Sequence, residues 1–396
     1  MRQPLRFFYA AGPGDIVGTF NHWNSGESDP SQVAITYSQQ FFDFVHAAGG
    51  KGLAISSCSR SAEVEGKGIR AVNAPKPRQF LPGAAGYLLT QILYGLYLLI
   101  QIIRFKPKVA VIADGTAPWI LFGPLAWFGI CIVPSIHCVF QTSKQPAKGF
   151  FPNWRQAADR FFFKNVAHHS ICVSPRIGQQ IMDLAGTDQS WSLFHPTYFR
   201  ETFQGMDLPN PRLNSIRLLY AGRIEKDKGV FELFEAFLSL QKYQSINLEL
   251  HYCGDGAAYD ALNQAVMDEG LQDSVFLHGH CSREVMRHFL GNCFAIVVPT
   301  TTAFVEGFNK VVAEGMLSGR PVIATTVCPA TDSFEDAVIA IEPDSSIAIE
   351  KAILTLIQSP EKYQDLCEQT KPAREAFLNP EYSWRSRLSQ VLCAGF

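Results

Sequence analysis

The sequence predicts an α/β protein made of two Rossmann-like domains, each built on a parallel sheet. Three observations support this prediction. The chain has 396 residues, a length that suits two domains better than one. Apolar runs of strand length alternate with helical patterns in both halves, as in parallel sheets that are covered on both faces. In the second half, several of these runs end at a glycine-containing turn, as in nucleotide-binding units.

Residues 1–205 are expected to form the first domain and residues 206–379 the second. The Pro-containing stretch between about Arg200 and Ser215 is the expected linker. In the first domain, strands are predicted at 5–10, 52–56, 109–113, 131–136 and 170–173, and helices at 31–48, 84–105, 117–128, 151–167 and 175–184.

A glycine-containing loop, Ala11-Gly-Pro-Gly-Asp, follows the first predicted strand. Gly12 and Gly14 let backbone amides approach an anion, so both are candidate donor-binding residues. The loop is expected to run on through His22 and Trp23 to Pro30, which is long for such a turn. Either these side chains grip an acceptor or the segment is a plain Ω-loop, and the sequence leaves both interpretations open.

Two cations follow the strand Leu218–Ala221 of the second domain, namely Arg223 and Lys228, and a helical pattern begins near Val230. Cations at the carboxyl end of a strand, beside a helix N-terminus, are typical of a diphosphate site. Glycines stand at the ends of this strand and the next one. The candidate donor-binding residues here are Gly222, Arg223, Lys228 and Gly254.

The most informative pair of residues is Glu306 and Glu314, with seven residues between them. Glu306 is expected in the turn before a helix, and Glu314 about two helical turns further on, roughly on the same side. One carboxylate is then placed to reach a reacting sugar while the other binds ribose hydroxyls.

With these motifs in this order, residues 216–326 resemble the retaining nucleotide-sugar glycosyltransferases of family 4, which have the GT-B fold of two domains facing a cleft. The resemblance implies that Arg223 and Lys228 hold the donor diphosphate, that Glu306 faces the hexose and that Glu314 binds the ribose. It implies that the backbone amides of Phe308, Asn309 and Lys310 contact the sugar and phosphate. The family often has a small residue in place of Asn309, so this side chain is expected to be able to contact the hexose.

The resemblance also concerns the first domain and the end of the chain. It places His137, at the end of a predicted strand, opposite the donor hexose, and it implies that the glycine loop closes over the donor phosphates. It further implies that residues 380–396 cross back onto the first domain. Asp114-Gly-Thr116 and His195-Pro-Thr197 depart from the family pattern, and both are expected on the acceptor side.

The mechanism implied by the resemblance is transfer with retention, by front-face attack without a protein nucleophile. Negative charge then grows on the departing diphosphate while the sugar becomes oxocarbenium-like. Arg223, Lys228 and the helix N-terminus after Glu306 would stabilise that charge, so no metal and no cofactor are expected. Glu306, His137, Arg223 and Lys228 are therefore the candidate catalytic residues. The expected partners are a nucleotide-sugar donor and a sugar, lipid-linked or small-molecule acceptor.

Charge is distributed unevenly along the chain. Residues 1–200 hold 18 Lys+Arg and 10 Asp+Glu, a net charge of +8, while the remainder carries −10. A basic first half favours an anionic partner, and peripheral membrane contact is one expectation. Nucleic acid is not expected, because the basic residues are scattered without a binding motif.

Residues 87–105 are apolar enough to suggest a membrane segment. A spanning helix is rejected because the run is interrupted by polar residues and lies between two strands of one predicted sheet. A helix packed deep on the sheet and an interfacial helix both remain open.

Ten cysteines without metal-binding spacing, and no visible signal peptide, predict a cytoplasmic protein, with the inner face of the membrane as a further expectation. Two alternatives to a transferase remain. One is a glycosyltransferase-like binding subunit without catalysis, and the other is a nucleotide-sugar epimerase of the same fold.

Overall fold

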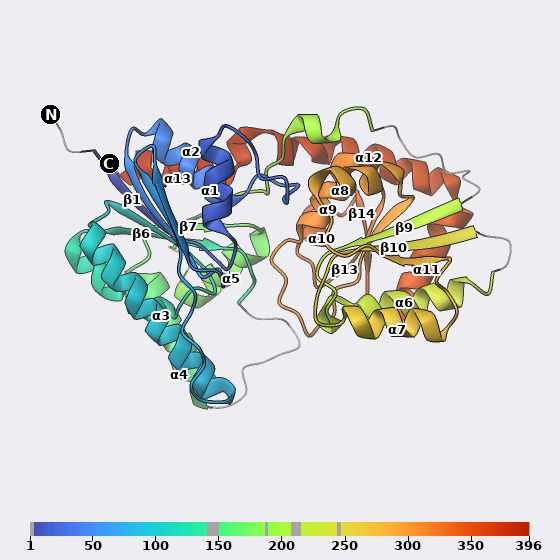
Figure 1. Cartoon of the computed structure of the whole chain (residues 1–396), viewed down its shortest axis with the longest axis horizontal. Helices are drawn as coiled ribbons and strands as arrows, with labels where there is room; N and C mark the ends of the chain where they lie inside the picture. The colour runs from blue at the N-terminus through green and yellow to red at the C-terminus, as the bar shows by residue number, and fades with distance from the viewer. Residues whose placement is uncertain (1–3, 141–149, 187–188, 207–214, 244–246, 396) are drawn as a thin grey trace.

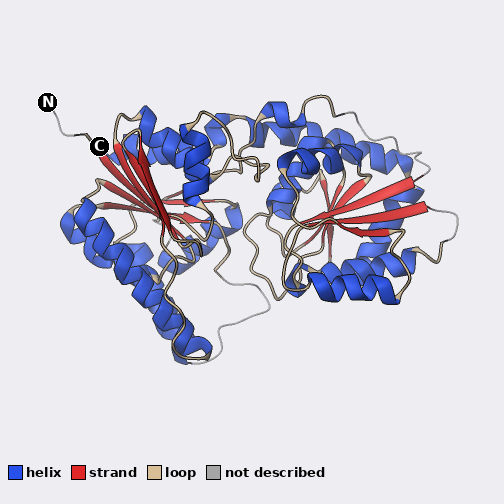
Figure 2. Cartoon of the chain, in the orientation of Figure 1, coloured by secondary structure: helices blue, strands red, loops and turns tan. Residues whose placement is uncertain are grey.

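The computed structural model describes residues 4–140, 150–186, 189–206, 215–243 and 247–395. It shows two α/β domains side by side, each with a central sheet and helices on both faces (Figures 1 and 2). The predicted fold class is confirmed. The linker expected near residues 200–215 contains a short 3₁₀ helix, η2 (Arg200–Phe203), and its residues 207–214 lie outside the described part of the chain.

The first sheet has eight strands in the order β3-β4-β2-β1-β5-β6-β7-β8, and β3 is the antiparallel edge strand. β1 lies in the middle because its four buried residues pack on both sides. The strands are β1 (Arg6–Ala10), β2 (Lys51–Ser56), β3 (Ala62–Gly66), β4 (Ile69–Asn73), β5 (Val109–Ala113), β6 (Cys131–Ile136), β7 (Ser170–Cys172) and β8 (Trp191–Leu193).

The hairpin β3–β4 and the edge strand β8 are absent from the sequence-based prediction. Lys67 and Gly68 form the two-residue turn of the hairpin, and both have positive φ, 48° and 78°. Such turns usually carry Asn-Gly or Asp-Gly, so Lys-Gly gives a weak signal. β3 is also mostly exposed and charged, and β8 has only three residues, so neither has a strong apolar pattern.

Two of the helices predicted for the first domain differ in the structure, and one helix, α1, was not predicted. The helix expected from residue 31 begins only at Tyr37, because the Thr36 hydroxyl accepts a hydrogen bond from the backbone N–H of Gln39 (3.1 Å) and caps it there. The helix expected at 117–128 is a 3₁₀ helix with Pro124 inside it. The helices are α1 (Ile16–Asn24), α2 (Tyr37–Ala47), α3 (Gly83–Phe105), η1 (Trp119–Phe128), α4 (Phe150–Asn165) and α5 (Pro175–Ala185).

The extended loop expected from Ala11 to Pro30 is wrong for its central part, which forms α1. Asp15 caps this helix through the backbone N–H of Gly18 (2.8 Å). Trp23 does not point toward a ligand. Its indole N–H donates to Asp43 of α2 (2.8 Å), and its ring packs on Phe42 with a centroid distance of 5.4 Å.

The second sheet has six parallel strands in the order β11-β10-β9-β12-β13-β14. The direction of the strand order changes between β9 and β12, and ligands of open α/β sheets bind at the carboxyl ends of strands at such a point. The strands are β9 (Ser215–Ala221), β10 (Asn247–Cys253), β11 (Val275–Leu277), β12 (Ala295–Val298), β13 (Val322–Thr325) and β14 (Val338–Ile341).

The helices of the second domain cover both faces of its sheet (Figure 2). They are η3 (Lys226–Lys228), α6 (Val230–Leu240), α7 (Tyr259–Asp268), α8 (Arg283–Asn292), α9 (Lys310–Ser318), α10 (Ala330–Ser333), α11 (Ser346–Gln358) and α12 (Pro360–Leu378). The apolar residues on one face of the sheet form a core of their own, while those on the other face are continuous with the core of the first domain.

The end of the chain returns to the first domain. After η4 (Pro380–Tyr382), helix α13 (Trp384–Gly395) packs against α2. Trp384 is fully buried. Its indole N–H donates to the hydroxyl of Ser135 in β6 (2.8 Å), and its ring lies 5.4 Å from that of Tyr9 in β1. The last helix is therefore part of the first domain's core.

Candidate active site in the interdomain cleft

A cavity of about 190 Å³ lies at the carboxyl ends of β9 and β12, where the strand order reverses. All of its lining residues belong to the second domain. They are Tyr220, Ala221, Gly222, Arg223, Lys228, Val298, Pro299, Thr300, Glu306, Asn309, Lys310 and Val311. The cavity thus contains six of the twelve candidate residues, and these come from three separate segments of the sequence.

The centre of the cavity is an ion pair between Lys228 and Glu306, whose Nζ and Oε2 atoms are 3.0 Å apart. The two side chains are only 13% and 11% exposed. Lys228 ends η3 and Glu306 lies in the loop between β12 and α9, so residues 78 positions apart meet here. The Lys228 ammonium also lies 3.3 Å from the ring centroid of Phe304, a cation–π contact.

Asn309 holds this arrangement in place. Its side-chain N–H₂ donates to Glu306 Oε2 (3.2 Å), and its side-chain oxygen accepts from the backbone N–H of Val311 (3.1 Å) and caps α9. Asn309 adopts φ = 67°, a left-handed conformation that asparagine tolerates better than most residues. In this structure the amide of Asn309 is engaged with Glu306 and with the helix.

Arg223 lies at the mouth of the cavity. Its side chain is 56% exposed, its Nη1 donates to Glu225 (2.7 Å), and its guanidinium carbon lies 5.6 Å from the centroid of the Phe304 ring. The ring of Phe304 thus has both cations nearby.

Gly222 and Gly254 let the ends of β9 and β10 approach closely. Both have φ values that L side chains rarely adopt, 149° and 155°. A Cβ at Gly254 would lie 1.7 Å from the carbonyl oxygen of Gly222, so no side chain fits there. Gly254 is absent from the cavity lining, and in this structure it supports the neighbouring loop that carries Gly222.

The first domain contributes the opposite wall of the cleft at the end of β6. A Cβ at Gly307, the residue after Glu306, would lie 1.5 Å from the carbonyl oxygen of His137, so the two backbones touch only because residue 307 is glycine. The His137 ring lies 4.5 Å from that of Tyr37, and its Nε2 is 2.8 Å from the Ser135 hydroxyl. Burial, followed by the charge of Lys310, lowers the pKa of His137 to about 3, so the ring is neutral at pH 7.

Asp114 fixes the turn that presents His137. Its two carboxylate oxygens accept hydrogen bonds from the backbone N–H groups of His137 (3.1 Å) and Cys138 (2.9 Å). Burial raises the pKa of Asp114 to about 6. The carboxylate therefore acts on the backbone beside His137, while Thr116 donates to the carbonyl of Ala113 (2.7 Å).

Glu314 lies outside the cavity in this structure. It is 7% exposed, and its Oε1 accepts a hydrogen bond from the hydroxyl of Tyr198 (3.4 Å). Burial raises the pKa of Glu314 to about 7, although Lys310 and Tyr198 oppose this shift. Lys310 bridges the domains, with its ammonium 5.0 Å from the centroid of the Tyr37 ring.

Phe308 is 3% exposed and packs on Phe377 of α12, with ring centroids 5.8 Å apart. The structure thus does not bring Phe308 or Glu314 into the cavity lining beside Glu306.

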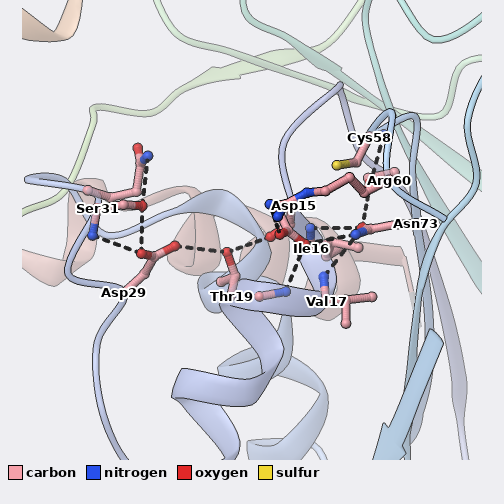
Figure 3. A network of polar contacts seen from close by, with 12 residues as sticks. Asp15, Ile16, Val17, Thr19, Asp29, Ser31, Cys58, Arg60 and Asn73 are labelled. Atoms are coloured by element: carbon pink, nitrogen blue, oxygen red, sulfur yellow. Dashed lines mark hydrogen bonds and ion pairs between the residues drawn. The ribbon is translucent and has the colours of Figure 1, made fainter. Parts of the chain in front are cut away.

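Gly12 and Gly14 also lie outside the cavity lining. A Cβ on either would meet nothing within 4 Å, so the space beside this loop is open. Figure 3 shows the polar network that anchors the end of the loop. Asn73 of β4 accepts from the backbone N–H of Ile16 (3.1 Å) and donates to Asp15 (2.8 Å), which also pairs with Arg60 (3.0 Å).

Residues 28–32, which follow α1, join the two domains through hydrogen bonds to Arg283, and we call this contact the clasp. Arg283 of α8 donates to the carbonyl of Gln32 (2.7 Å), to the hydroxyl of Ser28 (2.6 Å) and to the carbonyl of Asp29. On the other side of the cleft, Arg176 of α5 pairs with Asp332 of α10 (2.6 Å). The stretch interpreted as an acceptor grip or an Ω-loop therefore binds the second domain.

His195-Pro-Thr197 lies where the chain leaves the first domain, not on an open acceptor surface. His195 is 9% exposed, and its backbone N–H donates to the carbonyl of Tyr382 (2.9 Å). Its ring lies between Phe308, Phe334 and Phe377. Burial lowers the pKa of His195 to about 4. The structure corrects the expected position of this turn.

Three aromatic residues at the site are missing from the sequence prediction: Tyr37, Tyr198 and Phe304. Tyr37 lies in a segment far from the motifs, and Tyr198 directly follows His195-Pro-Thr197, but no local pattern indicates that either reaches the site. Phe304 is two residues before Glu306, so its proximity to the cavity was available from the sequence, but its contact with both cations was not. Among the described residues, no group of three or more His, Cys, Asp or Glu side chains is placed to hold a metal ion.

Comparison with known proteins agrees with this architecture. Sucrose-phosphate synthase from Thermosynechococcus elongatus has a similar structure, with a TM-score of 0.73 and 17% identity over 99% of this chain and 100% of that chain. Anabaena HepE, solved with UDP, gives a TM-score of 0.68 and 13% identity over 99% of this chain and all of that one. The molecule therefore has the GT-B fold. Residues 209–372 match the family model described as "Glycosyl transferases group 1".

A relative in sequence is lipopolysaccharide 1,2-N-acetylglucosaminetransferase of Salmonella typhimurium, 28% identical over 179 residues. The alignment covers 43% of this chain and 45% of that protein, so the chain matches less than half the length of this relative.

Proposed function

We propose that the protein is a retaining glycosyltransferase that moves a hexose from a nucleotide-diphosphate sugar to an acceptor hydroxyl. One observation carries this proposal. The nearly buried Lys228–Glu306 pair, fixed by Asn309, lies at the switch point of the second sheet, within the segment that matches the group 1 family. A carboxylate and a cation held together in a cavity suit a reaction in which positive and negative charge develop on neighbouring atoms.

The donor diphosphate is proposed to bind between Lys228, Arg223 and the N-terminus of α9. Arg223 is exposed and forms an ion pair with the nearby Glu225, so its fork of donors can turn toward phosphate oxygens. The N-terminus of α9 adds positive partial charge, although its Val311 N–H already donates to the Asn309 cap. Lys228 would then stabilise the departing phosphate and Glu306 together, and the site needs no metal or cofactor in this proposal.

Glu306 is proposed to orient the hexose and to stabilise the oxocarbenium-like carbon without bonding to it. His137 faces the loop of Glu306 across the contact with Gly307. Because its pKa is lowered to about 3, His137 is a neutral hydrogen-bonding group and not a general acid at pH 7. Gly12, Gly14 and Glu314 would join the donor site only after a rearrangement of the cleft, since none of them lines the cavity here.

The acceptor is proposed to be a sugar, a lipid-linked sugar or a small molecule, in polysaccharide, glycolipid or glycoconjugate biosynthesis. The name of the Salmonella relative, a lipopolysaccharide transferase, supports this setting. A cytoplasmic location is proposed because the nine cysteines whose side chains the structure describes are free thiols, which is typical of a reducing compartment.

A binding subunit without catalysis is the competing proposal, and one observation favours it. Glu314, the expected ribose ligand, is closed off against Tyr198 in this structure. An enzyme of this type must expose that carboxylate when the donor binds, whereas a non-catalytic subunit has no such need.

The first experiment measures thermal shifts of the purified protein with UDP-, GDP- and ADP-sugars. At a hundredfold excess of ligand over Kd, binding stabilises the folded protein by about 2.7 kcal/mol. We expect one nucleotide class to raise the melting temperature, and both Arg223→Ala and Glu314→Ala to reduce that shift. Donor consumption with formation of a glycosylated acceptor would then separate a transferase from a binding subunit or an epimerase. Absence of a shift with every nucleotide would contradict the proposal.

A further inference from the structure

One surface of the first domain is apolar where a water-soluble protein is normally polar. Helix α3 buries one stripe of residues against the domain, among them Thr90, Tyr94, Leu98 and Ile102. Its opposite stripe is also apolar, since Leu89, Leu93, Leu96 and Ile100 follow helical spacing and are 36–47% exposed. A surface helix of a globular domain usually carries polar residues on that side.

The apolar surface continues beyond α3. The 3₁₀ helix η1 contacts both α3 and α4, and it ends in Trp127 and Phe128, which are 87% and 61% exposed. On α4, Trp154 and Phe161 are 57% and 54% exposed. We call this the α3–η1–α4 surface. It forms the lower left flank of the first domain in Figure 1. Single exposed apolar residues are normal, but a continuous patch of this kind marks an interaction site.

The charge around this surface indicates what covers it. Residues 74–169 contain ten Lys+Arg and two Asp+Glu, a net charge of +8. The net charge of residues 1–200 is also +8, so this segment accounts for the whole positive excess of the first domain. Several of these cations are exposed on the helices themselves, at Arg104, Arg155, Arg160 and Lys164.

We infer that the α3–η1–α4 surface docks onto an anionic lipid bilayer. Exposed Trp and Phe side chains suit the boundary between headgroups and acyl chains, while Lys and Arg beside them attract anionic headgroups. Helix α3 is the one described helix that is long and apolar enough to cross a membrane by length and composition. It cannot span one in this fold, because its inner stripe packs against η1 and β1. The helix therefore lies on the membrane, and of the two interpretations from the sequence the structure favours the interfacial one.

This inference goes beyond the proposed transfer reaction and does not depend on it, because vesicle binding is measured without donor or acceptor. The experiment is co-flotation of the purified protein with vesicles of equal parts phosphatidylcholine and phosphatidylglycerol, and with phosphatidylcholine alone. We expect binding to the anionic vesicles, weakening as salt is added because exposed charges are screened.

Two sets of variants test the surface. Trp127→Ser with Phe128→Ser removes apolar contact, and Ile347→Ser is the control, since Ile347 is as exposed as Phe128 (62% and 61%) but lies in the second domain. Arg104→Glu, Arg160→Glu and Lys164→Glu reverse the charge. Their control is the triple change at the exposed second-domain residues Lys242, Lys351 and Lys362, which alters net charge by the same amount. We expect each surface set to weaken vesicle binding by roughly tenfold or more and the controls to have little effect.

Three results would overturn the inference. The wild-type protein would fail to bind anionic vesicles, or the control variants would lose as much binding as the surface variants. Alternatively, the protein would ignore vesicles but self-associate through Trp127 and Phe128, in which case a second copy of the chain covers the surface. Unchanged melting temperatures and nucleotide binding in the variants ensure that a loss of vesicle binding reflects the surface and not the fold.

Discussion

The two walls of the cleft are built in different ways. The wall of the second domain carries charge, in the form of Lys228, Glu306 and Arg223, and most of its residues come from two short stretches of sequence. The wall of the first domain is neutral at pH 7 at His137 and Tyr37, and its residues come from segments that are a hundred positions apart. The charged side chains of the cavity thus lie in the second domain, while His137 and Tyr37 of the first domain are neutral at pH 7.

Removing the carboxylate of the charged wall is expected to have the largest effect. In Glu306→Gln the fold and the contact with Asn309 are retained, but the negative charge near the reacting carbon is lost. We expect turnover to fall by about 10²–10³-fold, the range found when one preorganised electrostatic group is removed. Steady-state kinetics with donor and acceptor measure this, with the exposed Glu335→Gln as the control. Near-normal turnover would show that Glu306 is outside the mechanism.

Removing the cation of the Lys228–Glu306 ion pair is expected to affect the stability of the fold. Lys228→Met leaves the nearly buried Glu306 carboxylate without its cation, which we expect to cost about 3 kcal/mol of unfolding free energy. The double variant Lys228→Met, Glu306→Gln removes the uncompensated charge, so it should recover most of that stability while remaining inactive. Urea unfolding and donor binding measure the two effects separately. Equal stability of single and double variants would mean that the pair is well solvated.

The stability of the charged wall is expected to depend on pH through Glu314. Burial raises its folded pKa from 4.5 to about 7. The carboxyl group therefore stabilises the fold at pH values below its unfolded pKa, and this contribution is lost as the pH rises through 7. The unfolding free energy of Glu314→Gln, taken relative to that of wild type, should rise by about 2 kcal/mol between pH 5 and pH 8.

Two histidines change the stability in the opposite direction as the pH rises. Burial lowers the pKa values of His137 and His195, so both residues favour the folded state above pH 6.5. Both are present in wild type and in Glu314→Gln, so the difference between the two unfolding curves removes their effect. A difference that does not change with pH would indicate that Glu314 is solvated in the free protein.

The smallest expected effect concerns the clasp that joins the two walls. Arg283→Ala removes three hydrogen bonds from α8 to residues 28–32 of the first domain. We expect a loss of about 1 kcal/mol in unfolding free energy and a larger radius of gyration by small-angle X-ray scattering. Arg60→Ala, which removes an 80% exposed ion pair within the first domain, is the matched control and should change neither.

The difference between the walls also explains how much the sequence revealed. Arg223, Lys228 and Glu306 follow strands in short motifs, so their convergence at one edge of a parallel sheet is predictable from strand order alone. Tyr37 and Tyr198 reach the site through tertiary packing, which no local pattern encodes. The fold class followed from the alternation of strands and helices, whereas β3 and β8 were missed because they lie at sheet edges and have little apolar signal. β4 was missed together with β3, because the Lys-Gly turn of their hairpin gives a weak signal.

One expectation was wrong for a local physical reason. The segment after Gly14 looked like a loop because of its glycines, but Asp15 is a helix cap and α1 begins directly after it. The amide of Asn309 bonds to Glu306 and caps α9 in this structure, and its contact with the hexose stays a prediction. At both places a polar side chain caps a helix.

Trp384 has a consequence for how the protein is made. Its fully buried ring is part of the core of the amino-terminal domain, beside Tyr9 and Ser135. The first domain must therefore wait for α13, which follows the second domain in the chain, to emerge from the ribosome. The second domain has all its described strands and helices by Leu378 and can close earlier. Co-translational folding is thus expected to complete the second domain before the first, and a nascent chain stalled before residue 384 would expose an open core to chaperones and proteases.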